Sequence, residues 1–262
     1  MNFSISKPLL LGVVHLKPLP GSPRATATMK EIVKAAIIDA NGYEQGGADA
    51  VIIENFGDIP FTKGRVPAET CAAMAVAGQA VREAIKLRLG FNVLRNDPLT
   101  ALGLCAACGG DFIRINVHSG AMITDQGVIE GNAFETLRKR RELGLEHVKI
   151  FADIHVKHAT TLGDLSLEDA ARDTLDRALA DDLIVSGVGT GHPTAITDLD
   201  TVRKTCPKAP VLLGSGVRIE NVETYLGLAS GFIVGSSLKR DGKIGNPVDP
   251  KRVAKLVEKI RR

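Results

Sequence analysis

The sequence predicts a single (β/α)₈ barrel domain over residues 1–262, an α/β fold, and three observations support this fold class. Eight short runs rich in β-branched residues alternate with segments of helical length, and no linker interrupts the alternation. The length of 262 residues also fits, because α/β barrels commonly run about 200–250 residues as one domain. In two runs polar residues recur at alternate positions, which suits the lumen and mouth of a closed barrel. An open, doubly wound sheet is the alternative, since strand count does not distinguish the two.

The expected strands are short and largely apolar, and each precedes an expected helix. The strands span Leu9–His15, Ala50–Glu54, Leu89–Leu94, Phe112–His118, Val148–Val156, Leu183–Gly187, Val211–Ser215 and Phe232–Gly235. The helices span Met29–Gln45, Pro67–Leu87, Leu99–Cys108, Ala133–Leu143, Ser166–Ala180, Thr194–Thr205, Glu220–Leu228 and Pro250–Arg262. Two helix starts carry capping signals: Ser166 with Asp169 three residues later, and Asp249 before Pro250.

The polar rows favour closure of the sheet. In the run 112–118, Ile113, Ile115 and Val117 oppose Arg114, Asn116 and His118. In the run 149–157, the small and apolar residues Ile150, Ala152, Ile154 and Val156 oppose Lys149, Phe151, Asp153, His155 and Lys157. A doubly wound sheet covers both faces with helices and tolerates such rows poorly, whereas a barrel directs them to its mouth.

Composition and charge exclude several classes of protein. The chain has 33 Lys and Arg against 30 Asp and Glu, and a net charge of +3 is too small for a nucleic-acid binder. No apolar run approaches the ~20 residues that cross a bilayer, and no small-residue cleavage site follows a basic segment near the start, so we expect no signal peptide. We therefore expect a cytoplasmic homo-oligomer whose membrane association, if any, is peripheral. Cys105-Ala-Ala-Cys108 lies in an Ala-rich stretch, so two small helix residues are favoured over a redox or metal pair.

Two glycine-rich loops predict a phosphate site. The last two strands are followed by Gly214-Ser215-Gly216-Val217 and by Gly235-Ser236-Ser237-Leu238-Lys239. In barrels, these two positions commonly hold phosphate through backbone N–H groups and a helix N-terminus. We expect Gly214, Ser215, Gly216, Gly235, Ser236 and Ser237 to bind phosphate or another anion, with added charge from Lys239. The alternative is that both are simply tight turns.

Polar residues gather where the expected strands end, and they are the candidate catalytic groups. These are His15, Glu54, Asn92, Arg114, Asn116, His118, Asp153, His155 and Lys157, with Asn55, Arg95, Asn96, His158 and Ser186 at the same ends. Structural roles are the alternative to catalytic ones. Asn55 could form a turn, and Lys149 could belong to an ion pair at the bottom of the barrel.

Specific roles follow from the chemistry of these side chains. Arg114 would clamp a carboxylate or phosphate, and His118 would exchange protons near neutral pH. Asp153 would orient an imidazole or, with His155 and either His15 or His118, hold a divalent metal such as Zn²⁺, Mn²⁺ or Fe²⁺. Lys157 would act as a Schiff-base nucleophile or, more commonly for such a lysine, as an anion clamp.

Two loops are expected to cover the mouth. The proline-stiffened loop 15–21 would position Lys17 over it, and the long excursion Ser119–Gly127 resembles a lid that could deliver Asp125 and Gln126. A structural turn is the alternative for the second loop.

Seven motifs resemble those of the BtpA family, which includes the SgcQ proteins. They are Gly12–Pro23, Glu54–Phe61, Asn92–Asp97, Arg114–Ala121, Thr124–Gly127, Asp153–Ala159 and Gly214–Gly216. The resemblance implies a TIM-like barrel of the phosphate-binding type. In cyanobacteria the family name is tied to photosystem I biogenesis by a peripheral membrane factor.

Two functions of different classes therefore compete. The first is an enzyme acting on a small phosphorylated, sugar-like metabolite by aldolase, isomerase, lyase or hydrolase chemistry. The second is a non-catalytic factor for membrane-protein biogenesis. The combination of a polar mouth with anion loops favours the enzyme, because a scaffold needs neither.

Overall fold

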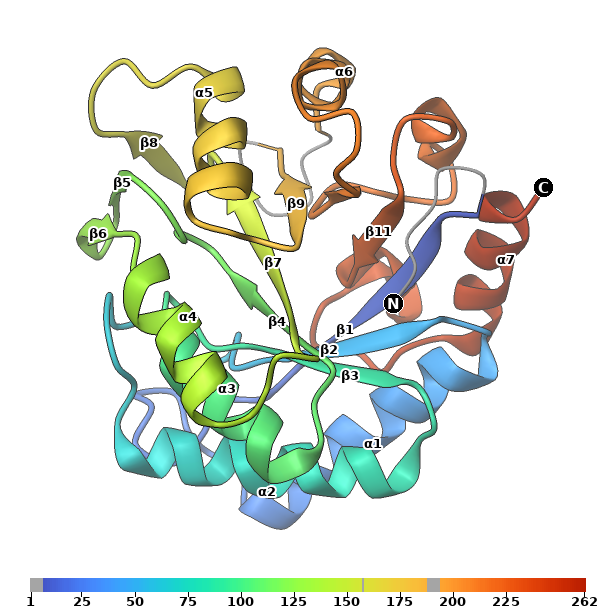
Figure 1. The fold of residues 1–262 in the computed structure, drawn as a ribbon. Helices are drawn as coiled ribbons and strands as arrows, with labels where there is room; N and C mark the ends of the chain where they lie inside the picture. Colours follow the sequence, from blue (N-terminus) through green and yellow to red (C-terminus); the bar gives the residue numbers. More distant parts are fainter. Residues whose placement is uncertain (1–6, 157, 188–193) are drawn as a thin grey trace.

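A closed barrel of eight parallel strands forms the centre of the protein, as the sequence predicts (Figure 1). The structure is a computed structural model that describes residues 7–156, 158–187 and 194–262. The barrel strands are β1 (Leu9–His15), β2 (Ala50–Glu54), β3 (Arg88–Asn92), β4 (Phe112–Ile115), β7 (Lys149–Ile154), β9 (Asp182–Val185), β10 (Val211–Leu213) and β11 (Gly231–Val234). Strand β1 closes the barrel because it pairs in parallel with both β2 and β11.

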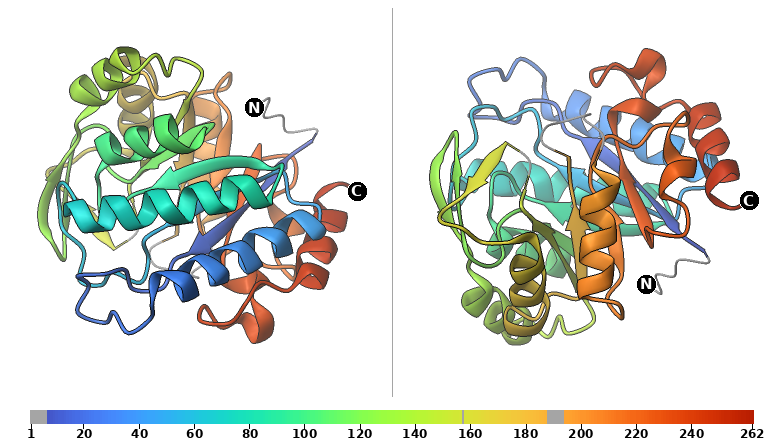
Figure 2. Two further views of the ribbon diagram at one scale, coloured as in Figure 1. Left: turned by 90° about the horizontal axis from the view of Figure 1, so that it is seen from below. Right: turned by 90° about the horizontal axis from the view of Figure 1, so that it is seen from above.

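Helices surround the barrel on its outer side (Figure 2). They are α1 (Met29–Gln45), α2 (Ala68–Ala84), α3 (Pro98–Cys108), α4 (Ala133–Glu142), α5 (Leu167–Arg172), α6 (Ile196–Thr205) and α7 (Pro250–Ile260). Side-chain caps begin α5 and α7 as expected, through Ser166 and Asp249. A capping box at Thr28 and Glu31, which the sequence analysis did not identify, begins α1.

Two expected helices differ in the structure. The segment 220–228 forms only a 3₁₀ turn, η2 (Val222–Tyr225), because Leu226 is extended and Gly227 adopts φ +81°. The segment 166–180 begins as α5, widens into a π-helical turn, η1 (Asp173–Arg177), and ends where Leu179 adopts φ +55°. Positive φ values stop right-handed helices.

Two apolar layers separate the inside of the barrel from its outside. Phe112 and Phe151 fill the interior with stacked rings whose centroids are 4.7 Å apart. Ile113, one position after Phe112, and Ile150, one position before Phe151, belong instead to the layer between strands and helices. The predicted alternation of faces is therefore confirmed, and it leaves Arg114 and Asp153 directed into the lumen above the aromatic rings.

Other sequence-based expectations about the scaffold are also confirmed. The ammonium of Lys149 lies 2.9 Å from Asp181 Oδ1, the ion pair expected at the start of its strand. Cys105 and Cys108 are buried on α3 as free thiols, and burial raises the pKa of both. Across the described ranges, no helix is both long enough and apolar enough to pass through a membrane.

A small antiparallel sheet lies beside the mouth of the barrel, at the upper left of Figure 1. The expected excursion after β4 is a hairpin of β5 (Ala121–Thr124) and β6 (Gly127–Glu130). Strand β5 also pairs with β8 (Ala159–Thr161), which belongs to the loop after β7. The loops after two neighbouring barrel strands thus form one sheet.

Candidate functional site

A buried charge network crosses the mouth of the barrel between β2, β4 and β7. Arg114 donates two parallel hydrogen bonds of 2.9 Å to the two oxygens of Asp153, and its Nη1 lies 3.4 Å from Glu54 Oε1. The side chains of Arg114 and Asp153 are 2% and 0% exposed, so both charges are removed from water. A bidentate pair of this kind is rigid and fixes the direction of the guanidinium.

The protonation of Arg114 is secured by this network. Burial alone would lower the pKa of the guanidinium, but the carboxylates of Asp153 and Glu54 more than compensate and raise it above its ordinary value. Arg114 is therefore a permanent cation. One edge of its guanidinium group is bound to Asp153, and the rest of the group faces the cavities described below.

Asp153 has no free hydrogen-bonding position for an imidazole or a metal. Its Oδ1 accepts from Arg114 and from Ser186 Oγ at 2.9 Å, and its Oδ2 accepts from Arg114 and from Asn116 Nδ2 at 3.1 Å. Among the described residues, no three His, Cys, Asp or Glu side chains come close enough to hold a metal. The expected metal or imidazole role of Asp153 is thus replaced by that of a counter-ion.

Glu54 is the carboxylate that faces open space. Asn92 Nδ2 donates to Glu54 Oε1 at 3.1 Å, the same oxygen that Arg114 approaches. Glu54 and Arg114 line two separate cavities and form the wall that the cavities share. A proton-transfer group needs such an accessible position.

The first cavity, which we call the loop cavity, lies at the two predicted glycine-rich loops and has a volume of about 510 Å³. It is lined by Val13, His15, Glu54, Arg114, Gly214, Ser215, Gly216, Val217, Arg218, Ile233, Val234, Gly235, Ser236, Ser237 and Ile244. In the described part of the chain, no carbonyl accepts from the backbone N–H groups of residues 215, 216, 217, 236 and 237. Unsatisfied N–H groups around one cavity are suited to an anion.

The serines of the loop cavity differ in their availability. Ser215 Oγ accepts from the N–H of Gly187 at 2.9 Å, and Ser237 Oγ donates to the carbonyl of Val217 at 2.8 Å. These two hydroxyls connect loops. The Ser236 hydroxyl makes no hydrogen bond to the described residues, so it is the serine available to a ligand.

Lys239 does not supply the positive charge that was expected at the anion-binding loops. Its side chain is buried and forms an ion pair with Asp39 of α1, away from the loop cavity. Arg218, which the sequence analysis did not select, lines the loop cavity instead. The cation near the two loops is therefore an arginine from the first loop and not a lysine from the second.

The glycines allow both loops to approach the charge network. A Cβ on Gly214 would lie 2.5 Å from Ser186 Oγ and 3.1 Å from Arg114 Nη2. A Cβ on Gly235 would lie 2.5 Å from Cε1 of His15. The third glycine, Gly216, adopts φ +72°, which favours glycine for conformational reasons.

The second cavity, which we call the aromatic cavity, extends from the shared wall toward the hairpin β5–β6 and has a volume of about 910 Å³. It is lined by Glu54, Phe56, Ile59, Phe61, Asn92, Leu94, Arg95, Arg114, Asn116, Asp125 and His158. Asp125 is at the hairpin turn, as the lid hypothesis expects, whereas Lys17 and Gln126 line neither cavity. Phe56, Ile59 and Phe61 were not selected as site residues, although all three lie in the motif 54–61.

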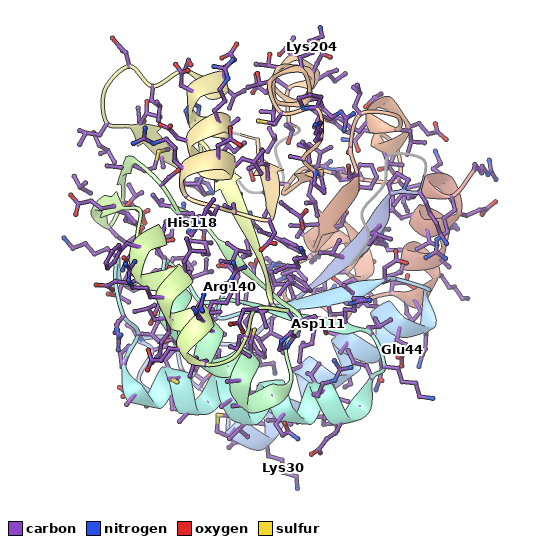
Figure 3. All side chains as sticks on the ribbon, in the orientation of Figure 1. Lys30, Glu44, Asp111, His118, Arg140 and Lys204 are labelled. Atoms are coloured by element: carbon purple, nitrogen blue, oxygen red, sulfur yellow. The ribbon has the colours of Figure 1, made fainter. Side chains whose placement is uncertain are left out.

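Two predicted catalytic residues, His118 and His155, line neither cavity. His118, labelled in Figure 3, is buried with Nε2 2.9 Å from the carbonyl of Ala178. Burial lowers its pKa to about 4, so the expected proton exchange near neutral pH does not fit. His155 is half-buried, with the backbone of Leu165 in hydrogen-bonding range of its ring, and burial lowers its pKa. Lys157 lies outside the described residues.

Two strand-end asparagines are structural. Asn55 donates to the carbonyl of Leu94 and accepts from its N–H at 2.7 Å, which supports the turn-former interpretation. Asn96 forms the same reciprocal pair with the backbone of Val117.

Comparison with known proteins gives matches along nearly the whole chain. A profile of the BtpA family matches residues 6–262. An uncharacterized protein of Thermococcus kodakarensis is 47% identical over 249 residues, which covers 95% of this chain and 94% of that protein. The photosystem I biogenesis protein BtpA of Synechocystis sp. is 43% identical over 249 residues, with 95% and 86% covered. The crystal structure of phosphoribosyl anthranilate isomerase from Thermus thermophilus has the same fold, with a TM-score of 0.58, 13% identity, and 96% and 98% covered.

Proposed function

The chain belongs to the BtpA family, and we propose that it is an enzyme acting on a small phosphorylated, sugar-like metabolite. The phosphate binds in the loop cavity, and the rest of the molecule extends past Glu54 and Arg114 into the aromatic cavity. The observation that carries the proposal is the set of five backbone N–H groups, of residues 215–217, 236 and 237, without a partner in the described chain.

The position of these groups supports phosphate as the anion. The two loops follow β10 and β11, the seventh and eighth strands of the barrel, where phosphate sites of this fold commonly lie. Arg218 and the Ser236 hydroxyl add a cation and a donor at the same cavity. The shared fold with phosphoribosyl anthranilate isomerase, an enzyme whose name contains a phosphorylated substrate, is consistent with this position but does not identify the reaction.

Glu54 and Arg114 supply the chemistry in this proposal. Glu54 takes or gives a proton at the part of the substrate next to the phosphate, because of the two carboxylates in the network only Glu54 has an oxygen without a hydrogen bond to the described residues. Arg114 stabilises the negative charge that develops on a substrate oxygen as the proton leaves. Movement of a proton next to a carbonyl is the common first step of isomerase, aldolase and lyase reactions.

Binding is tested by thermal unfolding in the presence of inorganic phosphate and of sugar phosphates. A ligand that binds only the folded state adds about 2.7 kcal/mol at a concentration 100 times its Kd, and the unfolding temperature rises accordingly. Ser236→Asp places a negative charge at the start of the 3₁₀ turn and should abolish this rise. The matched control is Ser166→Asp, which adds the same charge at the N-cap of α5, outside both cavities.

Three outcomes decide the proposal. It is supported when wild type and Ser166→Asp respond alike and Ser236→Asp does not. It fails when no phosphate compound stabilises the wild type, or when Ser236→Asp keeps the response.

Proton transfer is tested separately by ¹H NMR in D₂O, where Glu54→Gln should bind the stabilising sugar phosphate but no longer catalyse exchange of its C–H protons. Equal exchange in both proteins would exclude Glu54.

The name of the Synechocystis relative supports a second candidate, a non-catalytic factor for photosystem I biogenesis. That function requires no phosphate response, so the same titration separates the two candidates.

A further inference from the structure

We infer that the substrate carries a flat aromatic or heteroaromatic ring with a hydrogen-bond donor, attached through a sugar-like linker to its phosphate. This inference rests on the proposed function and goes beyond it, since it specifies the end of the substrate that lies farthest from the phosphate. It follows from the lining of the aromatic cavity.

The two cavities adjoin at two shared lining residues. Glu54 and Arg114 line both, so a molecule held at the loops by its phosphate would pass these two side chains before it enters the aromatic cavity. The aromatic cavity, of about 910 Å³, is also the larger of the two, so the phosphate is the smaller end of the ligand.

One part of the wall of the aromatic cavity does not suit the hydroxyl groups of a bare sugar. Phe56, Ile59, Phe61 and Leu94 offer apolar surface without hydrogen-bonding groups in their side chains. A hydroxyl buried against such surface loses its hydrogen bonds to water, whereas a flat ring gains contact area on both faces. This apolar part of the lining therefore favours a ring over a polyhydroxylated chain.

One buried atom specifies a donor on that ring. Asn116 is 2% exposed, and its Oδ1 has no hydrogen-bond partner among the described residues. Its orientation is determined by the network, because Nδ2 donates to Asp153 Oδ2 at 3.1 Å and a flipped amide would set two oxygens against each other. A buried acceptor without a partner costs stability until a ligand N–H or O–H meets it.

The proposal is tested by calorimetric titration with three kinds of probe: inorganic phosphate, ribose 5-phosphate, and the four common ribonucleoside 5′-monophosphates. We expect at least one nucleoside monophosphate to bind tenfold or more tightly than ribose 5-phosphate. Phe61→Ala should reduce this gain about tenfold, the scale of one ring contact, and leave the affinity for ribose 5-phosphate unchanged. The control is Phe134→Ala, at a phenylalanine on α4 that is 65% exposed and lines neither cavity.

The outcomes separate this inference from the proposed function. If ribose 5-phosphate binds and no nucleoside monophosphate binds more tightly, the ring is refuted while the phosphate site stands. If Phe61→Ala and Phe134→Ala behave alike, the ring does not contact the aromatic cavity and the inference is wrong. If Ser236→Asp leaves the affinity for every probe unchanged, the proposed function itself fails.

Discussion

Replacing Asp153 by asparagine tests whether the charge network is held by one carboxylate. The two oxygens of Asp153 accept four hydrogen bonds, two from Arg114 and one each from Asn116 and Ser186. An asparagine keeps one oxygen and turns an NH₂ group toward the donors on the other side. Among the described residues, Arg114, 2% exposed, would then retain Glu54, at 3.4 Å, as its one paired carboxylate.

The expected effect of Asp153→Asn is large. Removing one partner of a buried ion pair costs about 3–5 kcal/mol, against a total of about 5–15 kcal/mol for a typical domain. Urea denaturation at pH 7, followed by far-UV circular dichroism, measures the change. The double variant Arg114→Leu with Asp153→Leu should lose less than the sum of the two single changes, because it leaves no unpaired charge at these two positions.

A surface pair provides the control for this prediction. Asp200 pairs with Lys204 at 2.6 Å, but the two side chains are 41% and 76% exposed. Asp200→Asn should therefore change the free energy of unfolding very little. If Asp153→Asn falls within about 1 kcal/mol of the wild type, the carboxylate does not hold the network and the assignment of Asp153 as a counter-ion is refuted.

Three further predictions concern buried ionisable groups. Burial, together with Asp181, raises the pKa of Asp182 to about 7, so the folded protein keeps a proton that the unfolded chain releases near pH 4. Wild-type stability should thus fall by up to about 4 kcal/mol between pH 4 and pH 7 relative to Asp182→Asn, in urea titrations across this range; parallel curves would contradict this. The pKa of His118, lowered by burial to about 4, predicts the opposite sign. Below about pH 6.5 His118 binds a proton in the unfolded chain but stays neutral in the folded protein. Wild type should therefore lose stability from pH 6.5 to 4 relative to His118→Gln, as scanning fluorimetry would measure. Lys239→Met should lower the free energy of unfolding in urea by about 3 kcal/mol, because Asp39 keeps its charge without its cation, and adding Asp39→Leu should recover part of the loss.

The fold was predictable because its signals are local. The alternation of Ile113 with Arg114, and of Ile150 with Phe151, depends only on the two-residue period of a strand. The loop cavity was predictable for a related reason, since glycine-rich turns after the last two strands meet at one end of a closed barrel.

The same reasoning fails where a strand ends. Alternation places His118 on the face of Arg114, but β4 ends at Ile115, and the chain then carries His118 to the carbonyl of Ala178. Lys239 follows a 3₁₀ turn, and its partner Asp39 is 200 residues earlier in the chain. Neither the break in the strand nor such a distant pair leaves a periodic signal in the sequence.

The aromatic cavity was missed because its residues have ordinary chemistry. Phe56, Ile59 and Phe61 are apolar side chains in a loop, and a search for titratable groups passes over them. Their position in the motif 54–61, next to Glu54, was the available signal. These residues meet Asp125 and His158, from two other loops, at one cavity. No local sequence pattern predicts this meeting.

The small sheet β6–β5–β8 has a consequence for how tightly a ligand can be held. Asp125 lies at the turn of the hairpin and His158 immediately precedes β8, and both reach the aromatic cavity. Since β5 pairs with β8 through residues 122–124 and 159–161, the two loops share backbone hydrogen bonds before any ligand arrives. The conformational entropy of ordering these loops is therefore lost when the chain folds and is not subtracted again from the affinity. This side of the mouth is preorganised.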